Sequence, residues 1–157
     1  MKIVLLAVGN IKEQYLIEGI SHYNNRLAYY TKFEIVEIPN IKKSKGLSKI
    51  ELIREEGIRI LKYLNNYDYV VLLDETGKDF TSFKFAKKLQ QWLLVRKKRL
   101  VFVIGGAYGS SDLVNSRADE KLSLSRMTFS HQMVRLFFVE QIYRGLTILN
   151  NEPYHHN

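Results

Sequence analysis

The run Leu100-Val-Phe-Val-Ile104 breaks into Gly105-Gly106-Ala107-Tyr108-Gly109, and this junction decides the fold. Five consecutive apolar residues with β-branched members are typical of a strand buried on both faces, as in a parallel sheet. The glycines that follow let the backbone approach a ligand closely. Ligands of open α/β sheets bind at the carboxyl ends of the strands. We therefore expect a ligand site at residues 105–109, which we call the glycine loop.

Strands and helices alternate outward from this junction. Strands are predicted at residues 3–8, 33–38, 69–73 and 100–104, and helices at 12–30, 48–64, 82–96 and 132–149. This alternation predicts an α/β fold with a mainly parallel sheet flanked by helices. The 157 residues contain no linker and no internal repeat, so we expect a single domain over residues 1–157.

Two local signals add detail to this outline. Ser48-Lys-Ile-Glu51 has the spacing of a capping box, which predicts a helix start at Ser48. The apolar face of that helix is predicted to include Ile50 and Ile60. The polar stretch Asp74-Glu-Thr-Gly-Lys78 is typical of a turn, so the preceding strand is expected to end at Leu73.

The charge balance favours a polyanionic partner. The chain has 24 Lys and Arg against 16 Asp and Glu, a net charge of +8, which points to nucleic acid before membrane. Residues 84–99 contain seven basic side chains and no acidic one, and Lys42, Lys43, Lys45 and Lys49 form a second group. Both groups fit a surface that follows phosphates. The alternative is an ordinary solvated surface.

Several classes of protein are excluded or disfavoured. The chain has no cysteine, which rules out disulfides, thiolate metal sites and a thiol nucleophile. The apolar start at residues 3–8 is too short for a signal peptide or a membrane span, so we expect a cytoplasmic protein with no membrane partner. None of the four histidines has the spacing of a zinc site, and we expect no metal.

The glycine loop is not a nucleotide fingerprint. It matches neither the dinucleotide pattern G-x-G-x-x-G nor a Walker A loop, and the chain has no nucleophile elbow of the G-x-S-x-G type. Leu73-Asp74 closes one strand, Gly105 closes another, and Leu124 to Phe129 adds small and hydroxyl-bearing residues. These three segments are predicted to converge on one apolar slot. The alternative for the loop alone is a tight structural turn.

The segment from Gln132 to Leu149 is apolar on every side. Helices of this kind are buried, and in a chain of this size a partner subunit is a natural cover. We therefore predict a symmetric homodimer with Phe138 in the interface. The alternative is a helix buried in the core of its own chain.

Several motifs together resemble a known family. They are Leu72-Leu-Asp-Glu-Thr-Gly-Lys78, Val103-Ile-Gly-Gly106, Leu122-Ser-Leu-Ser-Arg-Met-Thr-Phe129 before His131, Glu140-Gln-Ile-Tyr-Arg144 and Pro153-Tyr-His155. Their order is similar to that of the ribosomal RNA large subunit methyltransferase H family, which belongs to the SPOUT, or α/β-knot, methyltransferases. The resemblance extends over essentially the whole chain.

The resemblance implies an enzyme that uses S-adenosylmethionine to methylate N3 of a pseudouridine in large-subunit (23S) ribosomal RNA on the assembled ribosome. It also implies a homodimer and a trefoil knot in the C-terminal part of the chain, a feature that periodicity does not reveal. The implied cofactor residues are Leu73, Gly105, Leu124, Ser125, Arg126, Met127, Thr128 and Phe129.

The implied chemistry needs a group that handles a proton. Holding the attacking nitrogen in line with the methyl group supplies much of the acceleration, but a ring imide is a poor nucleophile until it loses its proton. Our candidates for proton handling are His131 and His155, and for substrate orientation Arg135 and Tyr154. The alternatives are a structural histidine at a helix start and a frayed C-terminus.

The chain departs from the family pattern at two places. Ser130 stands where the family usually has proline, so a hydroxyl is expected to cap that turn. His156-Asn157 ends the chain where the family usually has Arg or Lys, which leaves RNA affinity sensitive to pH near neutrality. Two other functions stay open: the same fold acting on a different RNA such as a tRNA ribose, and a non-catalytic ribosome-binding module.

Overall fold

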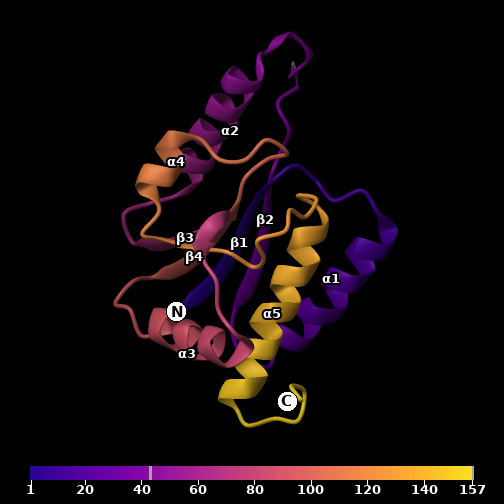
Figure 1. Ribbon diagram of the computed structural model, residues 1–157, viewed down its shortest axis with the longest axis vertical. Coiled ribbons are helices and arrows are strands. Elements are labelled where there is room, and N and C mark those ends of the chain that lie inside the picture. The colour runs from indigo at the N-terminus through magenta and orange to yellow at the C-terminus, as the bar shows by residue number, and fades with distance from the viewer. Residues whose placement is uncertain (43, 157) are drawn as a thin grey trace.

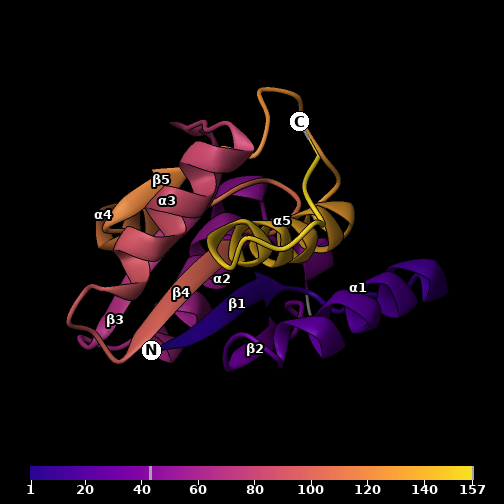
Figure 2. The same cartoon turned by 90° about the horizontal axis from the view of Figure 1, so that it is seen from below.

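The computed structural model describes residues 1–42 and 44–156, in which five parallel strands form one sheet of order β2-β1-β4-β3-β5. The strands are β1 Lys2–Val8, β2 Phe33–Ile38, β3 Asp68–Lys78, β4 Arg99–Ile104 and β5 Glu120–Leu122. Their order across the sheet can be followed in Figure 2. The predicted parallel α/β fold is confirmed, while the trefoil knot stays a prediction from the family resemblance.

Helices cover both faces of this sheet. They are α1 Gln14–Leu27, α2 Lys49–Tyr63, α3 Ser82–Leu93, α4 Asp112–Arg117 and α5 Met133–Leu149, with a short 3-10 turn at Ser44–Gly46. On one face α5 lies between α1 and α3 (Figure 1), and α2 packs with α4 on the other. Along β1 the buried side chains alternate between the two faces: Leu5 joins the core under α5, and Leu6 joins the core under α2.

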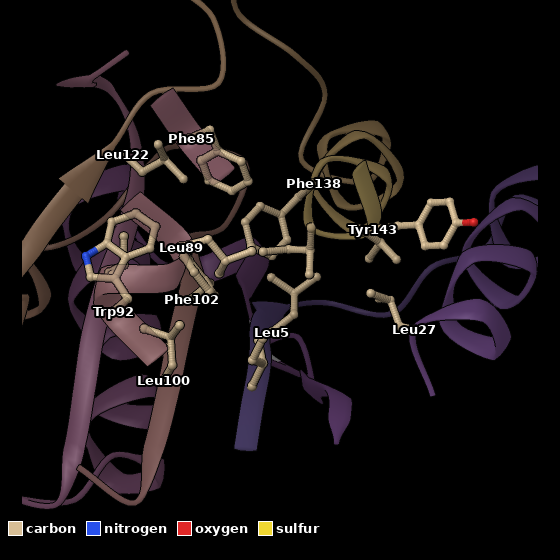
Figure 3. Close-up of a cluster of buried hydrophobic side chains, with 14 of the residues drawn as sticks. Leu5, Leu27, Phe85, Leu89, Trp92, Leu100, Phe102, Leu122, Phe138 and Tyr143 are labelled. Carbon is tan, nitrogen blue, oxygen red and sulfur yellow. The ribbon is translucent and has the colours of Figure 1, made fainter. Parts of the chain in front are cut away.

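The last helix is covered from within its own chain. Phe138 is fully buried, and its ring lies 4.7 Å from that of Phe102. Figure 3 shows it pointing from α5 toward Leu5 and Phe102. The prediction that Phe138 forms a subunit interface is therefore wrong, because the apolar surface of the sheet already surrounds this side chain. The preceding residue, Phe137, is 43% exposed.

The start of α2 is as predicted, but its apolar face is shorter. Ser48 Oγ accepts from the Glu51 amide and the Glu51 carboxylate accepts from the Ser48 amide, which confirms the capping box. Ile60 is buried, whereas Ile50 is 80% exposed. Ile50 belongs to the first turn of α2, and this end of the helix projects beyond the sheet (Figure 1).

Three details differ from the predicted outline. β3 continues to Lys78 through an irregular register against β5, so the turn expected at residues 74–78 is a bulged strand end. α4 and β5 were not predicted, because six and three residues are too few to show a hydrophobic period. None of the helices in the described residues is long and apolar enough to span a lipid bilayer.

Candidate functional site

A cavity of about 540 Å³ lies at the carboxyl ends of β3, β4 and β5. Its walls come from three segments: the end of β3, the glycine loop after β4, and the run that follows β5. The lining residues include Leu73, Asp74, Glu75, Thr76, Ile104, Gly105, Gly106, Tyr108, Leu122, Leu124, Ser125, Met127, Thr128, Phe129, His131 and Val134. The convergence of three strand ends is the arrangement in which α/β sheets bind ligands.

The glycine loop is a tight turn that has no space for side chains at its base. The Gly109 amide donates to Gly106 O at 3.1 Å, and Gly109 has φ +93°, which favours glycine. A Cβ on Gly105 would sit 2.6 Å from Ser110 Oγ and 2.7 Å from Gly109 O. A Cβ on Gly106 would sit 2.8 Å from the Glu56 carboxyl carbon. Bare backbone therefore forms this wall of the cavity.

Hydroxyl groups fold the run after β5 into the opposite wall. Ser123 Oγ donates to Ser125 O at 2.9 Å, and Ser125 Oγ accepts from the Met127 amide at 2.9 Å. Thr128 Oγ1 donates to Glu75 Oε2 at 3.3 Å, which links this run to the end of β3. The serines thus shape the segment, and Leu124 and Phe129 supply apolar surface.

Glu120 fixes β5 in place before this run begins. Its Oε1 accepts from the Tyr69 hydroxyl at 2.6 Å, from Lys88 Nζ at 2.8 Å and from Trp92 Nε1 at 3.0 Å. Burial favours a higher pKa for Glu120, but these hydrogen bonds and the charge of Lys88 outweigh it, so its pKa is below the ordinary glutamate value. A three-residue strand is thereby anchored to both β3 and α3.

Seven of the eight cofactor residues implied by the resemblance line the cavity: Leu73, Gly105, Leu124, Ser125, Met127, Thr128 and Phe129. Arg126 does not: its side chain is 87% exposed, with Nε 3.8 Å from Asp79 Oδ2. The sequence reasoning missed Lys49, which reaches the cavity from α2 with Nζ 5.1 Å from the Tyr108 ring centre. No local signal in the sequence places the first turn of α2 beside the glycine loop.

Acidic groups at the end of β3 face the same cavity. Asp74 is partly buried, which favours a higher pKa, but hydrogen bonds from Thr76 and the charge of Lys121 hold its pKa below the ordinary value. Asp74 is thus an ionised acceptor beside apolar side chains such as Leu73 and Ile104. Apolar walls, bare backbone and a few acceptors suit an adenosine joined to a methionine chain. The described residues contain no cluster of three or more metal-ligating side chains.

His131 lines the cavity just before α5. Burial, together with the nearby charge of Arg135, lowers the pKa of His131. The imidazole is therefore neutral at physiological pH, the form that accepts a proton. The predicted cap at this turn is confirmed, because Ser130 Oγ accepts from the Met133 amide at 3.0 Å.

Arg135 is wholly buried and lies outside the cavity lining. Its guanidinium donates to Val8 O at 2.6 Å, Gly9 O at 2.7 Å and His131 O at 3.1 Å, and it lies 3.3 Å from Glu37. Four of the five N–H groups of an arginine are used in this way. In one chain, Arg135 ties the first turn of α5 to the end of β1.

Tyr154 and His155 lie in an ordered polar network beyond the end of α5. The Tyr154 hydroxyl donates to Glu140 Oε1 at 3.0 Å, and Arg144 Nη1 lies 3.0 Å from His155 Nδ1. Because arginine only donates, this contact makes Nδ1 of His155 the acceptor and leaves the proton on Nε2. The tail is therefore held on α5 rather than frayed; Asn157 lies outside the described residues.

The four catalytic candidates form two groups at opposite ends of α5. His131 and Arg135 are at its beginning, and Tyr154 and His155 follow its end (Figure 1). A helix of 17 residues is about 25 Å long. One copy of the chain does not bring all four side chains to one substrate atom.

Comparison with known proteins gives one consistent result. The family described as "Predicted SPOUT methyltransferase" matches residues 1–155. Proteins named ribosomal RNA large subunit methyltransferase H are 54% identical in Parabacteroides distasonis and 52% identical in Christiangramia forsetii, each over 99% of both chains. A SpoU methyltransferase structure, AviRb from Streptomyces viridochromogenes in complex with AdoMet, gives a TM-score of 0.43 at 13% identity, covering 90% of this chain and 56% of that one. A similarity this low adds nothing to the family match.

Proposed function

This chain belongs to the SPOUT methyltransferase family, and on that premise we propose that it methylates N3 of a pseudouridine in 23S ribosomal RNA on the assembled ribosome. It is a methyltransferase with S-adenosylmethionine as its cofactor. The names of relatives about half identical over the full chain support a large-subunit ribosomal RNA as the substrate.

The cavity at the ends of β3, β4 and β5 is the observation that carries this proposal. It brings together three separate segments of the chain: the end of β3, the glycine loop and the run 122–129. Seven of the eight cofactor residues that we propose line it, and Arg126 is left at the surface. The bare backbone of Gly105 and Gly106 would give hydrogen-bonding groups to the cofactor without steric obstruction.

His131 is our candidate for the proton acceptor. When bound, S-adenosylmethionine supplies an electrophilic methyl group, and the nitrogen that attacks it must first lose its proton. His131 lies on the cavity wall in a setting that keeps it neutral. Arg135 acts through His131, because it donates to the His131 carbonyl and fixes that turn.

We further propose that the active form is a homodimer in which Tyr154 and His155 of one copy serve the cavity of the other. The separation of these residues from His131 along α5 supports this arrangement. Apolar side chains beside the cavity are exposed in the single chain: Met127 by 77%, Phe129 by 37% and Phe137 by 43%. The rings of Phe129 and Phe137 are 5.0 Å apart and form one patch that a second copy would cover.

The RNA is proposed to contact basic side chains around α3. Lys88 and Arg99 are engaged in ion pairs with Glu120 and Asp68. Lys84 and Lys87 are exposed on α3 and remain candidates for phosphate contacts. Of the second basic group, Lys43 lies outside the described residues. Action on ribosomes implies a cytoplasmic protein.

The test is methyl transfer from labelled S-adenosylmethionine to ribosomes that lack the modification, with separated subunits and free ribosomal RNA alongside. The proposal predicts label on pseudouridine and only with whole ribosomes. Label on another nucleotide, or on tRNA, would show that the proposed substrate is wrong, while the protein would still be a methyltransferase. Ribosome binding without cofactor binding would favour the non-catalytic module.

A further inference from the structure

A buried carboxyl group lies directly behind the glycine loop and has no part in the chemistry above. Glu56 on α2 is only 7% exposed, and its carboxyl packs against the backbone of Gly106. Among the buried side-chain nitrogen and oxygen atoms of the described residues, Glu56 Oε2 alone has no hydrogen-bond partner. A buried carboxyl group without a hydrogen-bond partner destabilises the folded state, so the presence of Glu56 at this position needs an explanation.

The next residue holds α2 at this close distance. A Cβ on Gly57 would overlap Ser111 Oγ and sit 2.9 Å from Ser111 Cβ. Ser111 caps α4 immediately after the glycine loop, with its Oγ accepting from the Val114 amide. Glu56 therefore packs against Gly106 in the loop, and Gly57 packs against the Ser111 side chain that follows the loop, so α2 is held close on this side.

Among the described residues, one charged group shifts the pKa of this carboxyl. Arg59 on α2 acts on it electrostatically, although its guanidinium also donates to Pro39 O at 3.0 Å. The other charged side chains on the two packed helices are Lys49, Glu51, Arg54, Glu55 and Lys62 on α2 and Asp112 and Arg117 on α4. Burial raises the pKa of Glu56, and Arg59 opposes this in part. The glycine loop itself carries no charged side chain.

We propose that Glu56 is the buried counter-charge of the methyl donor, and that it makes the site prefer S-adenosylmethionine to the product S-adenosylhomocysteine. The donor has a positive sulfonium and the product an uncharged thioether. Gly106 touches Glu56 on one side and lines the cavity on the other. Two contacts of about 4 Å each place a ligand on this wall roughly 8 Å from the carboxyl.

The size of the effect follows from this distance. A full charge pair about 8 Å apart, away from bulk water, changes a binding constant on the order of tenfold. Binding of the cation favours the ionised form of Glu56, so any protonated fraction of this carboxyl releases its proton to solvent. The product S-adenosylhomocysteine has an uncharged sulfur, so it gains no attraction to the carboxylate and is released more readily. The inference rests on the cofactor assigned above.

Calorimetry of the full-length protein with each ligand tests this inference. Titrations in two buffers of different ionisation enthalpy, between about pH 5 and pH 8, count the protons released. Wild-type protein is expected to release protons with S-adenosylmethionine and fewer with S-adenosylhomocysteine. In Glu56→Gln, which keeps the shape, affinity for the donor should fall about tenfold and affinity for the product should change by less than about twofold.

Two controls separate this role from others. Glu55→Gln removes the same charge from the exposed face of α2 and should leave both affinities unchanged. His131 also faces the cavity, and proton release that persists undiminished in Glu56→Gln would overturn the inference, because another group would then be its source. Equal weakening of both ligands in Glu56→Gln would overturn the inference, because it would mean a structural role. If that variant does not fold, wild-type proton release that is equal for the two ligands would overturn the inference in its place. Failure of the wild type to bind either ligand would overturn the cofactor assignment itself.

Discussion

Asp68 is fully buried at the amino end of β3, and Arg99 at the start of β4 neutralises it. Arg99 Nε donates to Oδ1 at 2.7 Å and Nη2 to Oδ2 at 2.6 Å, and the guanidinium lies 4.9 Å from the Tyr63 ring centre. The Asn65 amide also donates to Oδ2 at 2.9 Å. This pair joins two central strands at the end of the sheet opposite the cavity.

Removing the arginine should destabilise the protein strongly. We expect Arg99→Ala to lower the free energy of unfolding by about 3 to 5 kcal/mol, because Asp68 is left buried without its counter-charge. Urea unfolding followed by circular dichroism measures this. Asp68→Asn combined with Arg99→Ala should recover part of the loss. A single variant as stable as the wild type would show that the pair contributes nothing net.

The histidine at the cavity gives a second prediction at this scale. Replacing His131 by Ala should lower kcat by about 100-fold or more, as loss of a general base does. Because the pKa of His131 is lowered, wild-type activity should persist below the ordinary histidine value of about 6.5 before it falls with acid. The pH profile of single-turnover methyl transfer measures both, and unchanged kcat in the variant would exclude the assigned role.

At the scale of elements, the glycine loop depends on the absence of a side chain. Gly105→Ala places a Cβ within 2.7 Å of Gly109 O, so the turn must open and the cavity wall must shift. We expect the dissociation constant of S-adenosylmethionine to rise at least about tenfold, measured by calorimetry. Gly46→Ala is the matched control, because nothing lies within 4 Å of a Cβ there. Equal binding by the two variants would contradict this account of the loop.

Elements with strong periodicity could be predicted from sequence, and elements that depend on distant partners could not. The buried run at residues 100–104 and the capping box at Ser48 are local patterns, and both are present. β5 has three residues and exists because β3 pairs with it and Glu120 is anchored from β3 and α3. The assignment of Phe138 failed because hydrophobicity shows that a side chain is buried but not by which partner.

The candidate site shows the same division. The glycine loop could be predicted as a cavity segment because glycines follow an apolar strand, and the run 122–129 because of its small and hydroxyl-bearing residues. Lys49 and Glu56 could not be found in this way, since only the packing of α2 against residues 105–111 brings them near. Arg135 was a candidate for substrate orientation, but its hydrogen bonds to Val8 and Gly9 could be seen only in the fold.

At the scale of the whole molecule, carboxylates with lowered pKa values make the fold sensitive to acid. Glu120, Asp74 and Glu51 all have pKa values below their ordinary ones. Their contribution to the stability of the folded protein is therefore present above the ordinary pKa values of about 4. It is lost as the pH falls through the lower pKa values of the folded state. We expect the thermal midpoint to decline below about pH 4.5 and Glu120→Gln to flatten this decline, as calorimetric scans would show. A decline of equal steepness in both proteins would exclude Glu120.

Substitutions at Phe137 and Phe138, which are neighbours in α5, should distinguish an effect on dimer assembly from an effect on folding. Phe137→Asp should give a folded monomer, since this side chain is 43% exposed in the single chain. Phe138→Asp should abolish folding, because it places a charge in the core beside Phe102. Sedimentation and circular dichroism distinguish the two outcomes. A Phe137→Asp variant that remains dimeric would move the proposed interface away from this patch.

The hydrogen bonds from Arg135 to Val8 and Gly9 join residues 126 or more positions apart. Contacts of this separation form late, because a long loop must close first. During synthesis, the first strand leaves the ribosome long before the helix that completes its end. We therefore expect nascent chains to lack cofactor binding until the last helix has emerged, so the protein becomes able to bind its methyl donor only at the end of its synthesis.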